Sequence, residues 1–173
     1  MHVALITCAI LRSANGPEQA ARFRAHADEI FRVGESAPGV VARAVHDGDR
    51  GDLEPGLRDW GPWGSYADPD LSLTEAEEPY RAVQTLSVWE GYPAVKRFAY
   101  ERLHRPASRG ADTETFLHRP WPNYCLWWVD SGHQVTWTEA ASRLDYLHTQ
   151  GNTPVAFTFH LPFDARAFPI DGI

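Results

Sequence analysis

The sequence is poor in cysteine, in methionine and in positive charge. Its 173 residues include two cysteines and one methionine, and 16 Lys and Arg residues stand against 23 Asp and Glu residues, which gives a formal net charge of −7. An acidic chain without a basic run is a poor nucleic-acid binder, because neutralisation of phosphates drives that binding. It also lacks the cluster of Lys and Arg that an anionic membrane attracts.

Long apolar runs are absent as well. No run approaches the roughly 18 apolar residues of a membrane-spanning helix. The opening MHVALITCAIL is apolar but has no basic segment before it, so it predicts a first strand and not a signal peptide. Cys8 and Cys125 lie in separate apolar segments and there is no CxxC, which favours reduced, buried thiols in a cytoplasmic protein. A bridge between neighbouring strands is the alternative.

Motifs of known catalytic spacing do not occur. The sequence contains no HExxH, no G-x-S-x-G, no G-x-G-x-x-G and no GK[ST]. The acidic stretch 47–54 lacks the spacing of a twelve-residue calcium loop, so a solvated turn is the better interpretation. These absences count against a metal site, a nucleotide site and acyl-enzyme chemistry.

Aromatic residues, in contrast, are abundant. The chain has 7 Trp, 6 Tyr and 8 Phe, and 43% of its residues are hydrophobic, which is enough for the core of one domain over residues 1–173. Many Trp residues in a small domain indicate a large aromatic interior or an interface.

Apolar periodicity predicts alternating strands and helices. We expect strands over 2–11, 40–46, 82–90, 124–129 and 155–159, and helices over about 17–35, 93–103 and 137–150. The last helix has a capping box, Thr136 to Glu139, and Gly151 as its C-terminal cap. This order predicts an α+β protein with a ferredoxin-like βαβ-βαβ antiparallel sheet, helices on one face, and an extra C-terminal helix and strand.

A long insertion at about 47–79 interrupts this pattern. It is rich in Gly, Pro and Asp, and it contains Trp60 and Trp63. A loop this long within a compact domain is usually functional or disordered, and its aromatic residues argue against disorder. We expect the insertion to pack Trp60 and Trp63 onto the body of the domain.

The stretch VQTLSVWEGYPAVKRFAYERLHR is the centre of the functional prediction. Period two places Trp89 on the same strand face as Thr85 and Ser87. Tyr100 lies one helical turn before His104, on a flank of the following helix. We expect these side chains to converge on one pocket. Core packing is the alternative for Trp89, and a favourable interaction with the helix dipole is the alternative for His104.

Three further residues are candidates for the same pocket. Trp127 and Trp128 point to opposite faces of their strand, so at most one of them lines the pocket, and we assign Trp128. His118 and Arg119 lie in an irregular segment after the helix and are placed to approach a ligand. A solvated surface arginine is the alternative for Arg119.

Several segments together resemble the DUF3291 family of the dimeric α/β-barrel superfamily. They are TLSVWEGYPAVKRFAYERLHR, LWWVDSGH, TWTEAASRLDYL and TPVAFTF, and the resemblance is strongest over residues 83–160. It implies a ferredoxin-like protomer whose sheet pairs with that of a second subunit in a homodimer. It also implies a small-molecule cavity between the sheet and its helices. The insertion departs from the family pattern, in which the second and third strands are usually joined by a short connection.

The superfamily includes cofactor-independent monooxygenases, haem-degrading enzymes, chlorite dismutases, and cyclases and isomerases. The resemblance therefore favours an enzyme that acts without a cofactor on a hydrophobic, polycyclic or polyketide-like metabolite, by oxygenation or by acid/base isomerisation or cyclisation. In this hypothesis His104 shuttles a proton and Tyr100 hydrogen-bonds a substrate oxygen. The residues expected to bind the substrate have aromatic or cationic side chains: Trp60, Trp63, Trp89, His118, Arg119 and Trp128. The alternatives are a haem protein with His104 as axial ligand and a non-catalytic small-molecule binder.

Overall fold

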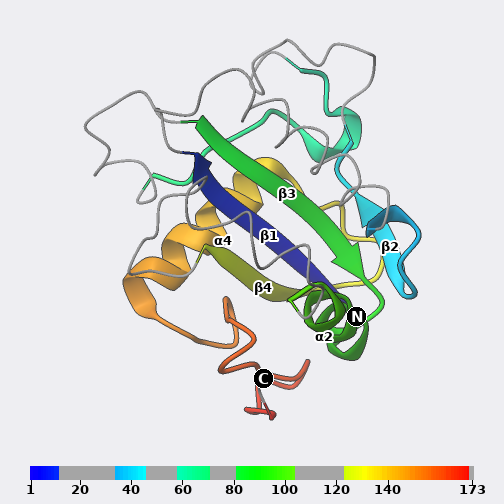
Figure 1. Cartoon of the computed structure of the whole chain (residues 1–173). Coiled ribbons are helices and arrows are strands. Elements are labelled where there is room, and N and C mark those ends of the chain that lie inside the picture. The colour runs from blue at the N-terminus through cyan, green and yellow to red at the C-terminus, as the bar shows by residue number, and fades with distance from the viewer. Residues whose placement is uncertain (12–33, 46–57, 71–80, 104–122, 172–173) are drawn as a thin grey trace.

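The computed structural model describes residues 1–11, 34–45, 58–70, 81–103 and 123–171 (Figure 1). Its elements in chain order are β1 (His2–Leu11), β2 (Val40–Arg43), the short 3-10 helix η2 (Gly61–Trp63), β3 (Arg81–Trp89), α2 (Tyr92–Leu103), β4 (Tyr124–Val129) and α4 (Trp137–Gln150). Nearly all of the helix predicted over 17–35 lies outside the described residues. Within the described part of the chain, no helix is long and apolar enough to cross a membrane.

The four strands form one sheet in the order β2-β3-β1-β4, and all neighbours are antiparallel (Figure 1). This confirms the α+β prediction and the antiparallel sheet, and it is compatible with a ferredoxin-like fold. β1, β3 and β4 lie where the apolar runs predict them. β2 ends at Arg43, earlier than predicted, and its register with β3 shifts between Val40 and Ala42. Such bulges are common at sheet edges.

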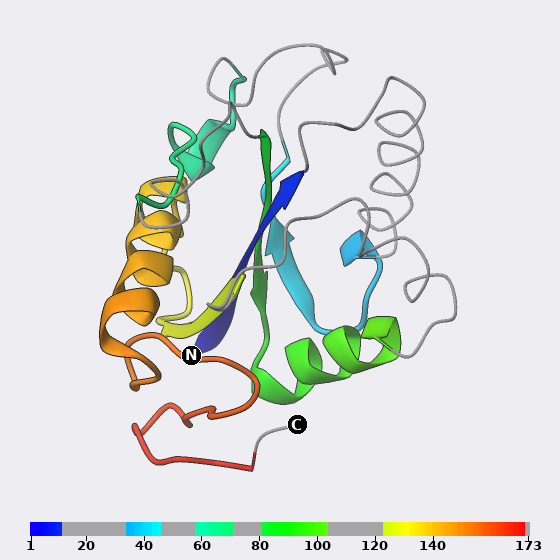
Figure 2. The same cartoon turned by 60° about the vertical axis from the view of Figure 1, so that its left-hand side comes forward.

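The two described helices cover opposite faces of the sheet (Figure 2). Alternate residues of each strand face opposite sides, so each face has its own core. The core under α4 contains Ala4, Ile6, Cys8, Leu86, Val88, Cys125, Trp127, Val129, Trp137, Ala140, Leu144 and Leu147. The core under α2 contains Val3, Leu5, Trp89, Tyr92, Val95, Leu126, Phe157 and Phe159. We call these the α4 face and the α2 face. The sequence predicted helices on one face of the sheet, but α4 lies on the face opposite α2.

α4 begins and ends as the sequence predicts. The Thr136 hydroxyl accepts a hydrogen bond from the backbone N–H of Glu139, at 3.2 Å, and Gly151 at φ 70° donates its N–H to the carbonyl of Leu147. A glycine suits this position because the left-handed conformation carries no side-chain penalty there. The cap fixes where the helix starts, directly after the turn that leaves β4.

The strand predicted over 155–159 is wrong as a regular element. Only Phe157 pairs with β4, through two hydrogen bonds with Leu126 at 2.8 and 2.9 Å. The chain turns on both sides of this bridge, because Thr153 pairs with Ala156 and Thr158 pairs with Leu161. These tight turns bring Phe157 and Phe159 to the α2 face without a continuous strand.

Residues 58–70, the described part of the insertion, pack onto the α4 face. Trp60 and Trp63 are 8% and 7% exposed, which confirms that they pack against the body of the domain. The Trp60 ring meets the Trp137 ring edge-on, with centroids 4.9 Å apart. The backbone N–H of Asp70 donates to Asp145 Oδ2 at 3.0 Å, which ties the end of the described segment to α4.

Candidate functional site

The α2 face changes character along the strands. Cross-strand partners share a face, so the pairing register defines three rows across β4, β1 and β3. The rows are Tyr124–Thr7–Thr85, then Leu126–Leu5–Ser87, then Trp128–Val3–Trp89. The side chains at one end of the face therefore carry hydroxyl groups, those in the middle are mainly aliphatic, and those at the other end are mainly aromatic.

The first row, which we call the hydroxyl row, consists of Tyr124, Thr7 and Thr85. The two threonine hydroxyls lie 2.7 Å apart and share a hydrogen bond. All three side chains are partly exposed, although β1 and β3 are the central strands of the sheet. Val3 and Leu5, on the same face of β1, are buried. The hydroxyl row thus combines side-chain hydroxyl groups with partial exposure at one end of this face.

The aromatic end of the α2 face is packed core. Trp89 is only 1% exposed, and its ring centroid lies 4.7 Å from that of Phe98 on α2. Its Nε1–H donates to Ser87 Oγ at 2.9 Å. Trp128 is partly buried and donates its Nε1–H to the carbonyl of Phe163 at 2.8 Å. Both indoles are on the predicted face, but their polar groups already have partners within the chain.

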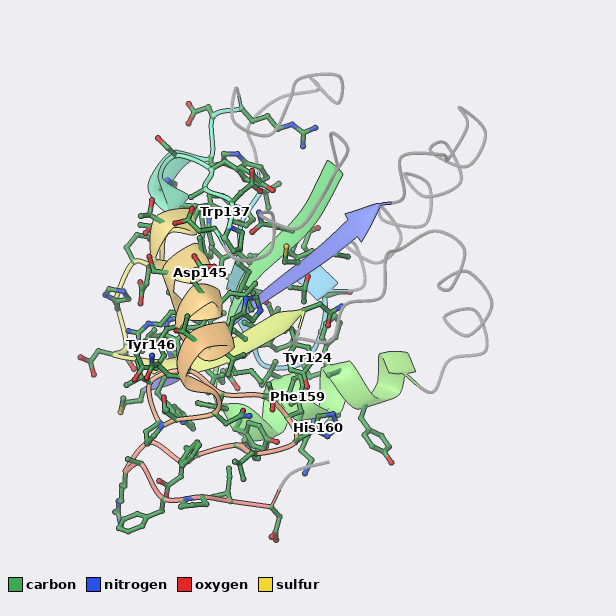
Figure 3. All side chains as sticks on the ribbon, turned by 90° about the vertical axis from the view of Figure 1, so that its left-hand side faces the viewer. Tyr124, Trp137, Asp145, Tyr146, Phe159 and His160 are labelled. Carbon is green, nitrogen blue, oxygen red and sulfur yellow. The ribbon has the colours of Figure 1, made fainter. Side chains whose placement is uncertain are left out.

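Tyr124 of the hydroxyl row and the buried Tyr92 of α2 both pack against Phe159. Tyr124, Phe159 and His160 lie together beside α2, whereas Trp137, Asp145 and Tyr146 follow α4 on the other side of the sheet (Figure 3). The Phe159 ring centroid is 5.3 Å from that of Tyr124 and 6.1 Å from that of Tyr92. The Tyr92 hydroxyl donates to the carbonyl of Phe159 at 3.5 Å, a long hydrogen bond.

The phenols of Tyr92 and Tyr124 stay protonated at neutral pH. Burial, and secondarily the neighbouring Tyr124, raises the pKa of Tyr92 to about 12. Burial also raises the pKa of Tyr124, and hydrogen bonding from the Phe159 backbone and the Thr158 hydroxyl offsets only part of that rise. Both groups are therefore suited to donating a hydrogen bond to a ligand oxygen and unsuited to acting as a base.

A cation lies at the β2 side of the same face. Arg43 is the register partner of Ser87, so its side chain starts from the α2 face. It forms an ion pair with Glu35. The Arg43 side chain is 14% exposed and the Glu35 side chain is 48% exposed, so the guanidinium is the buried member of the pair.

The structure divides the site residues predicted from the sequence. Trp89 and Trp128 share the α2 face, and Tyr100 lies on α2 with 46% of its surface exposed. Trp60 and Trp63 are on the opposite face, separated from the others by the sheet. The remaining three predicted residues lie outside the described residues: His104, His118 and Arg119.

The α4 face also has a polar cluster, in the first half of β3. Gln84 Nε2 donates to the Tyr66 hydroxyl at 2.8 Å and to Asp68 Oδ1 at 2.6 Å. Burial, followed by the charge of Asp68, raises the pKa of Tyr66 far above its ordinary value. The rings of Trp60, Tyr66 and Trp137 lie 4.9 to 6.0 Å apart by their centroids. They fill the space between themselves, so this cluster is a packed core that fastens the insertion.

Another polar network, centred on Glu139, joins β4 to α4. Its carboxylate accepts from Trp127 Nε1 at 3.0 Å and lies 2.7 Å from His133 Nε2 and 3.6 Å from Arg143. The carboxylate thus has side-chain partners, and His133 binds Glu139. Arg143 also donates to the carbonyl of Val155 at 2.9 Å.

Neither cysteine forms a disulfide, and both are buried on the α4 face. Burial raises the pKa of the Cys125 thiol to about 12, so its reactive thiolate is scarce at neutral pH. Among the described residues, no group of three or more His, Cys, Asp or Glu side chains could hold a metal ion.

A family model described as "Domain of unknown function (DUF3291)" matches residues 2–170. The chain belongs to the DUF3291 family. No curated protein and no solved structure matches it. The segments that resemble DUF3291 members include Trp127, His133, Glu139 and Arg143, which meet in the Glu139 network. In this DUF3291 protein these residues hold α4 against the sheet.

Sequence reasoning missed the hydroxyl row and Arg43. The two-residue periodicity of β3 identified Thr85 and Ser87 as its polar side. Thr7 lies within an apolar run, and because threonine is common in strands its presence there gave no functional signal. The missing information was the register, which places Thr7 beside Thr85 and Tyr124. Register depends on long-range pairing, and these strands are distant in the sequence.

Proposed function

We propose that this DUF3291 protein binds a small hydrophobic metabolite on the α2 face of its sheet, with an oxygen-bearing end of the ligand at the hydroxyl row. The observation that carries the proposal is the partial exposure of three neighbouring hydroxyl side chains, Thr7, Thr85 and Tyr124, at one end of a face whose other rows are mainly apolar. Small-molecule sites typically combine an apolar lining with a few converging polar groups.

The chemistry of these residues favours a ligand with carbonyl or hydroxyl groups. Threonine hydroxyls donate and accept, and the neutral phenol of Tyr124 donates. The Phe159 ring, 5.3 Å from that of Tyr124, provides an apolar surface beside the row, and Trp89 and Trp128 lie at the opposite end of the same face. Such a site recognises a flat polycyclic or polyketide-like compound by its oxygens at one end and by its ring system elsewhere.

Catalysis is the second step of the proposal. His104 follows directly after α2 and would transfer a proton, and Tyr100 would hydrogen-bond the substrate. His118 and Arg119 remain proposed contacts. The reaction classes are cofactor-independent oxygenation and acid/base isomerisation or cyclisation. Trp60 and Trp63 lie on the α4 face, so the proposed site does not include them.

A homodimer also remains a proposal, with a constraint on its interface. In a dimeric barrel the sheets of two subunits face each other. Here α4 and residues 58–70 pack on the face opposite α2. A sheet-to-sheet dimer would require α4 to leave, and a dimer of the described fold would therefore use another surface.

Non-catalytic binding is the second candidate function. It is favoured by the protonated phenols, because among the described residues on the α2 face we find hydrogen-bond donors and no base activated by a neighbour. Exchange of His104 for Gln distinguishes the two functions. Loss of turnover with retained ligand binding supports the enzyme, and unchanged turnover removes His104 from the mechanism.

Titration with a dihydroxyanthraquinone, followed by tryptophan fluorescence, tests the proposed site. We expect Thr7→Val, Thr85→Val and Tyr124→Phe each to weaken binding about two- to tenfold, the effect of one lost hydrogen bond. Thr138→Val and Tyr146→Phe are matched controls, because both side chains are exposed on α4. Equal affinities of the site variants and the controls would overturn the proposal.

A further inference from the structure

We infer that the exposed side of the C-terminal segment, residues 151–171, binds a second copy of this chain, with Phe168 as the main contact of the interface. The inference rests on the homodimer proposed above and names its surface. It starts from one loop, residues 163–169, which we call the Phe168 loop. The Phe168 side chain is 65% exposed, the largest exposed fraction among the large hydrophobic residues that the structure describes.

Hydrogen bonds around Asp164 close the Phe168 loop. Phe163 pairs with Pro169 at the base of the loop. The Asp164 N–H donates to the carbonyl of Phe168 at 2.8 Å, and Asp164 Oδ1 accepts from the backbone N–H groups of Arg166 and Phe168, at 2.9 Å each. One aspartate side chain therefore holds the backbone at the tip of the loop, as aspartates in turns commonly do.

The backbone directly before Phe168 is strained. Ala167 lies in the left-handed region at φ 68°, and it is the one non-glycine residue with positive φ in the described parts of the chain. This conformation is unfavourable for alanine, and it persists only where the surrounding structure determines it. Such strain is concentrated at functional sites. Here it is combined with an exposed aromatic side chain, which is the reason to assign a function to the loop.

The base of the Phe168 loop is fixed to the body of the domain, although the segment runs along its outside (Figure 2). Trp128 Nε1–H donates to the Phe163 carbonyl at 2.8 Å, and the Ile170 N–H donates to the Pro162 carbonyl at 3.0 Å. Phe163 and Ile170 also pack against the α2 face. A side chain displayed on a fixed backbone loses little entropy on binding, and aromatic residues are enriched at protein interfaces.

The charge of the C-terminal segment is compatible with a second copy of an acidic chain. Two copies with a formal charge of −7 each repel each other, so they meet most readily where the local charge is low. Residues 151–171 contain two carboxylates, Asp164 and Asp171, and one cation, Arg166, so their formal charge is −1 with histidine neutral. Arg166 and Asp171 are both exposed, and a two-fold interface needs such opposite charges on one patch because both copies present the same patch.

The remainder of the described fold leaves the two sheet faces occupied. α4 and residues 58–70 pack on one face, and α2 packs on the other. A second copy therefore binds at an edge or on an outer segment. Three of the exposed large hydrophobic residues lie in the C-terminal segment: Val155, Leu161 and Phe168. Exposed apolar side chains that recur along one segment are typical of an interaction surface.

Sedimentation velocity of the full chain over a series of concentrations tests the inference. We expect the wild-type protein to form a dimer whose fraction rises with concentration. We expect Phe168→Ser to raise the dimer Kd about thirtyfold or more, the effect of losing a dominant interface residue. We expect Asp164→Ala, which keeps Phe168 but removes the acceptor at the tip, to raise it about three- to tenfold. Asp164→Asn retains an acceptor oxygen and should stay within about twofold of wild type.

Val41→Ser is the control for the loss of exposed apolar surface elsewhere. Val41 is exposed and lies on β2, at the sheet edge opposite β4. Its dimer Kd should stay within about twofold of wild type, as expected for a surface substitution away from the contact. Hydrogen exchange locates the interface directly. Backbone amides of residues 161–170 should exchange more slowly in concentrated than in dilute protein, and those of β2 should not change.

The outcomes distinguish this inference from the homodimer on which it rests. A dimer that Phe168→Ser leaves intact, or slower exchange only in other segments, overturns the inference and leaves the homodimer standing. A wild-type monomer at every concentration overturns both. Because Phe168 is largely exposed, its variant is expected to fold, and circular dichroism checks this. Ligand binding at the hydroxyl row is measured separately, so the proposed binding function does not depend on either result.

Discussion

The two faces of the sheet use their aromatic residues differently. On the α4 face, Trp60, Trp63 and Trp137 pack tightly and seal the sheet with residues of the insertion. On the α2 face, Trp89 is equally buried, but the same face ends in three partly exposed hydroxyl side chains. The comparison teaches that the described part of the insertion, residues 58–70, belongs to the core of the α4 face, and that the contacts proposed for a ligand lie on the other face.

The largest expected difference between the faces is in stability. Trp137→Ala should lower the free energy of unfolding by about 3–5 kcal/mol, because it leaves a large cavity between α4 and the insertion. Tyr100→Ala, on the exposed side of α2, should change it by about 0.5 kcal/mol or less. Urea unfolding measures both. Trp137→Phe is the matched control, and it also removes a buried Nε1–H that has no hydrogen-bond partner in the described structure. A loss below about 1 kcal/mol for Trp137→Ala would contradict a sealed α4 face.

The second comparison concerns two glycines with similar backbone conformations. Gly39 has φ 85° and Gly132 has φ 90°, so alanine is strained at both. A Cβ at Gly39 would lie 2.6 Å from the Cβ of Ala94, whereas a Cβ at Gly132 meets nothing within 4 Å. We expect Gly39→Ala to be more destabilising than Gly132→Ala by about 1–3 kcal/mol, the typical effect of overpacking. Equal thermal stabilities of the two variants would show that the turn before β2 is not docked on α2.

The third comparison uses alkaline pH. The folded-state pKa of Tyr92 is raised from 10.0 to about 12, and that of Tyr66 is raised further, so folding favours the protonated phenols. Their contribution is fully present below pH 10, and it is lost as the pH rises through the folded-state pKa. Unfolding free energy should therefore fall above about pH 10, by up to about 1.4 kcal/mol per pH unit for each phenol. Tyr66→Phe and Tyr92→Phe should each reduce this dependence of the unfolding free energy on pH. An unchanged dependence in Tyr66→Phe would mean that Tyr66 of the insertion does not contribute to it.

The smallest effect is expected at the hydroxyl row. Thr7→Val leaves Thr85 without its partner, and we expect a loss of about 1 kcal/mol in the free energy of unfolding. The double variant Thr7→Val, Thr85→Val should lose less than the sum of the single losses, because it removes both ends of one hydrogen bond. Additive losses in this double-mutant cycle would mean that the two hydroxyls do not interact.

Local rules were sufficient for the elements and for the faces of individual strands. Period two correctly separated Trp89 from Val88 and Trp127 from Trp128, and the caps of α4 were visible in Thr136 and Gly151. The face on which a helix or an insertion packs depends on contacts between distant segments. The sequence therefore predicted that Trp60 would be buried, but its assignment to the substrate site placed it with residues that lie across the sheet.

The covering of the second face by α4 has a kinetic consequence. In a barrel made by two sheets, part of the apolar surface is buried only when two chains meet, so that step depends on concentration. Here the described residues on that face are buried by α4 and the insertion of the same chain. Closing this face is an intramolecular event, and the rate of that step should be the same in dilute and in concentrated protein. The insertion and α4 thus make the formation of this core independent of any encounter.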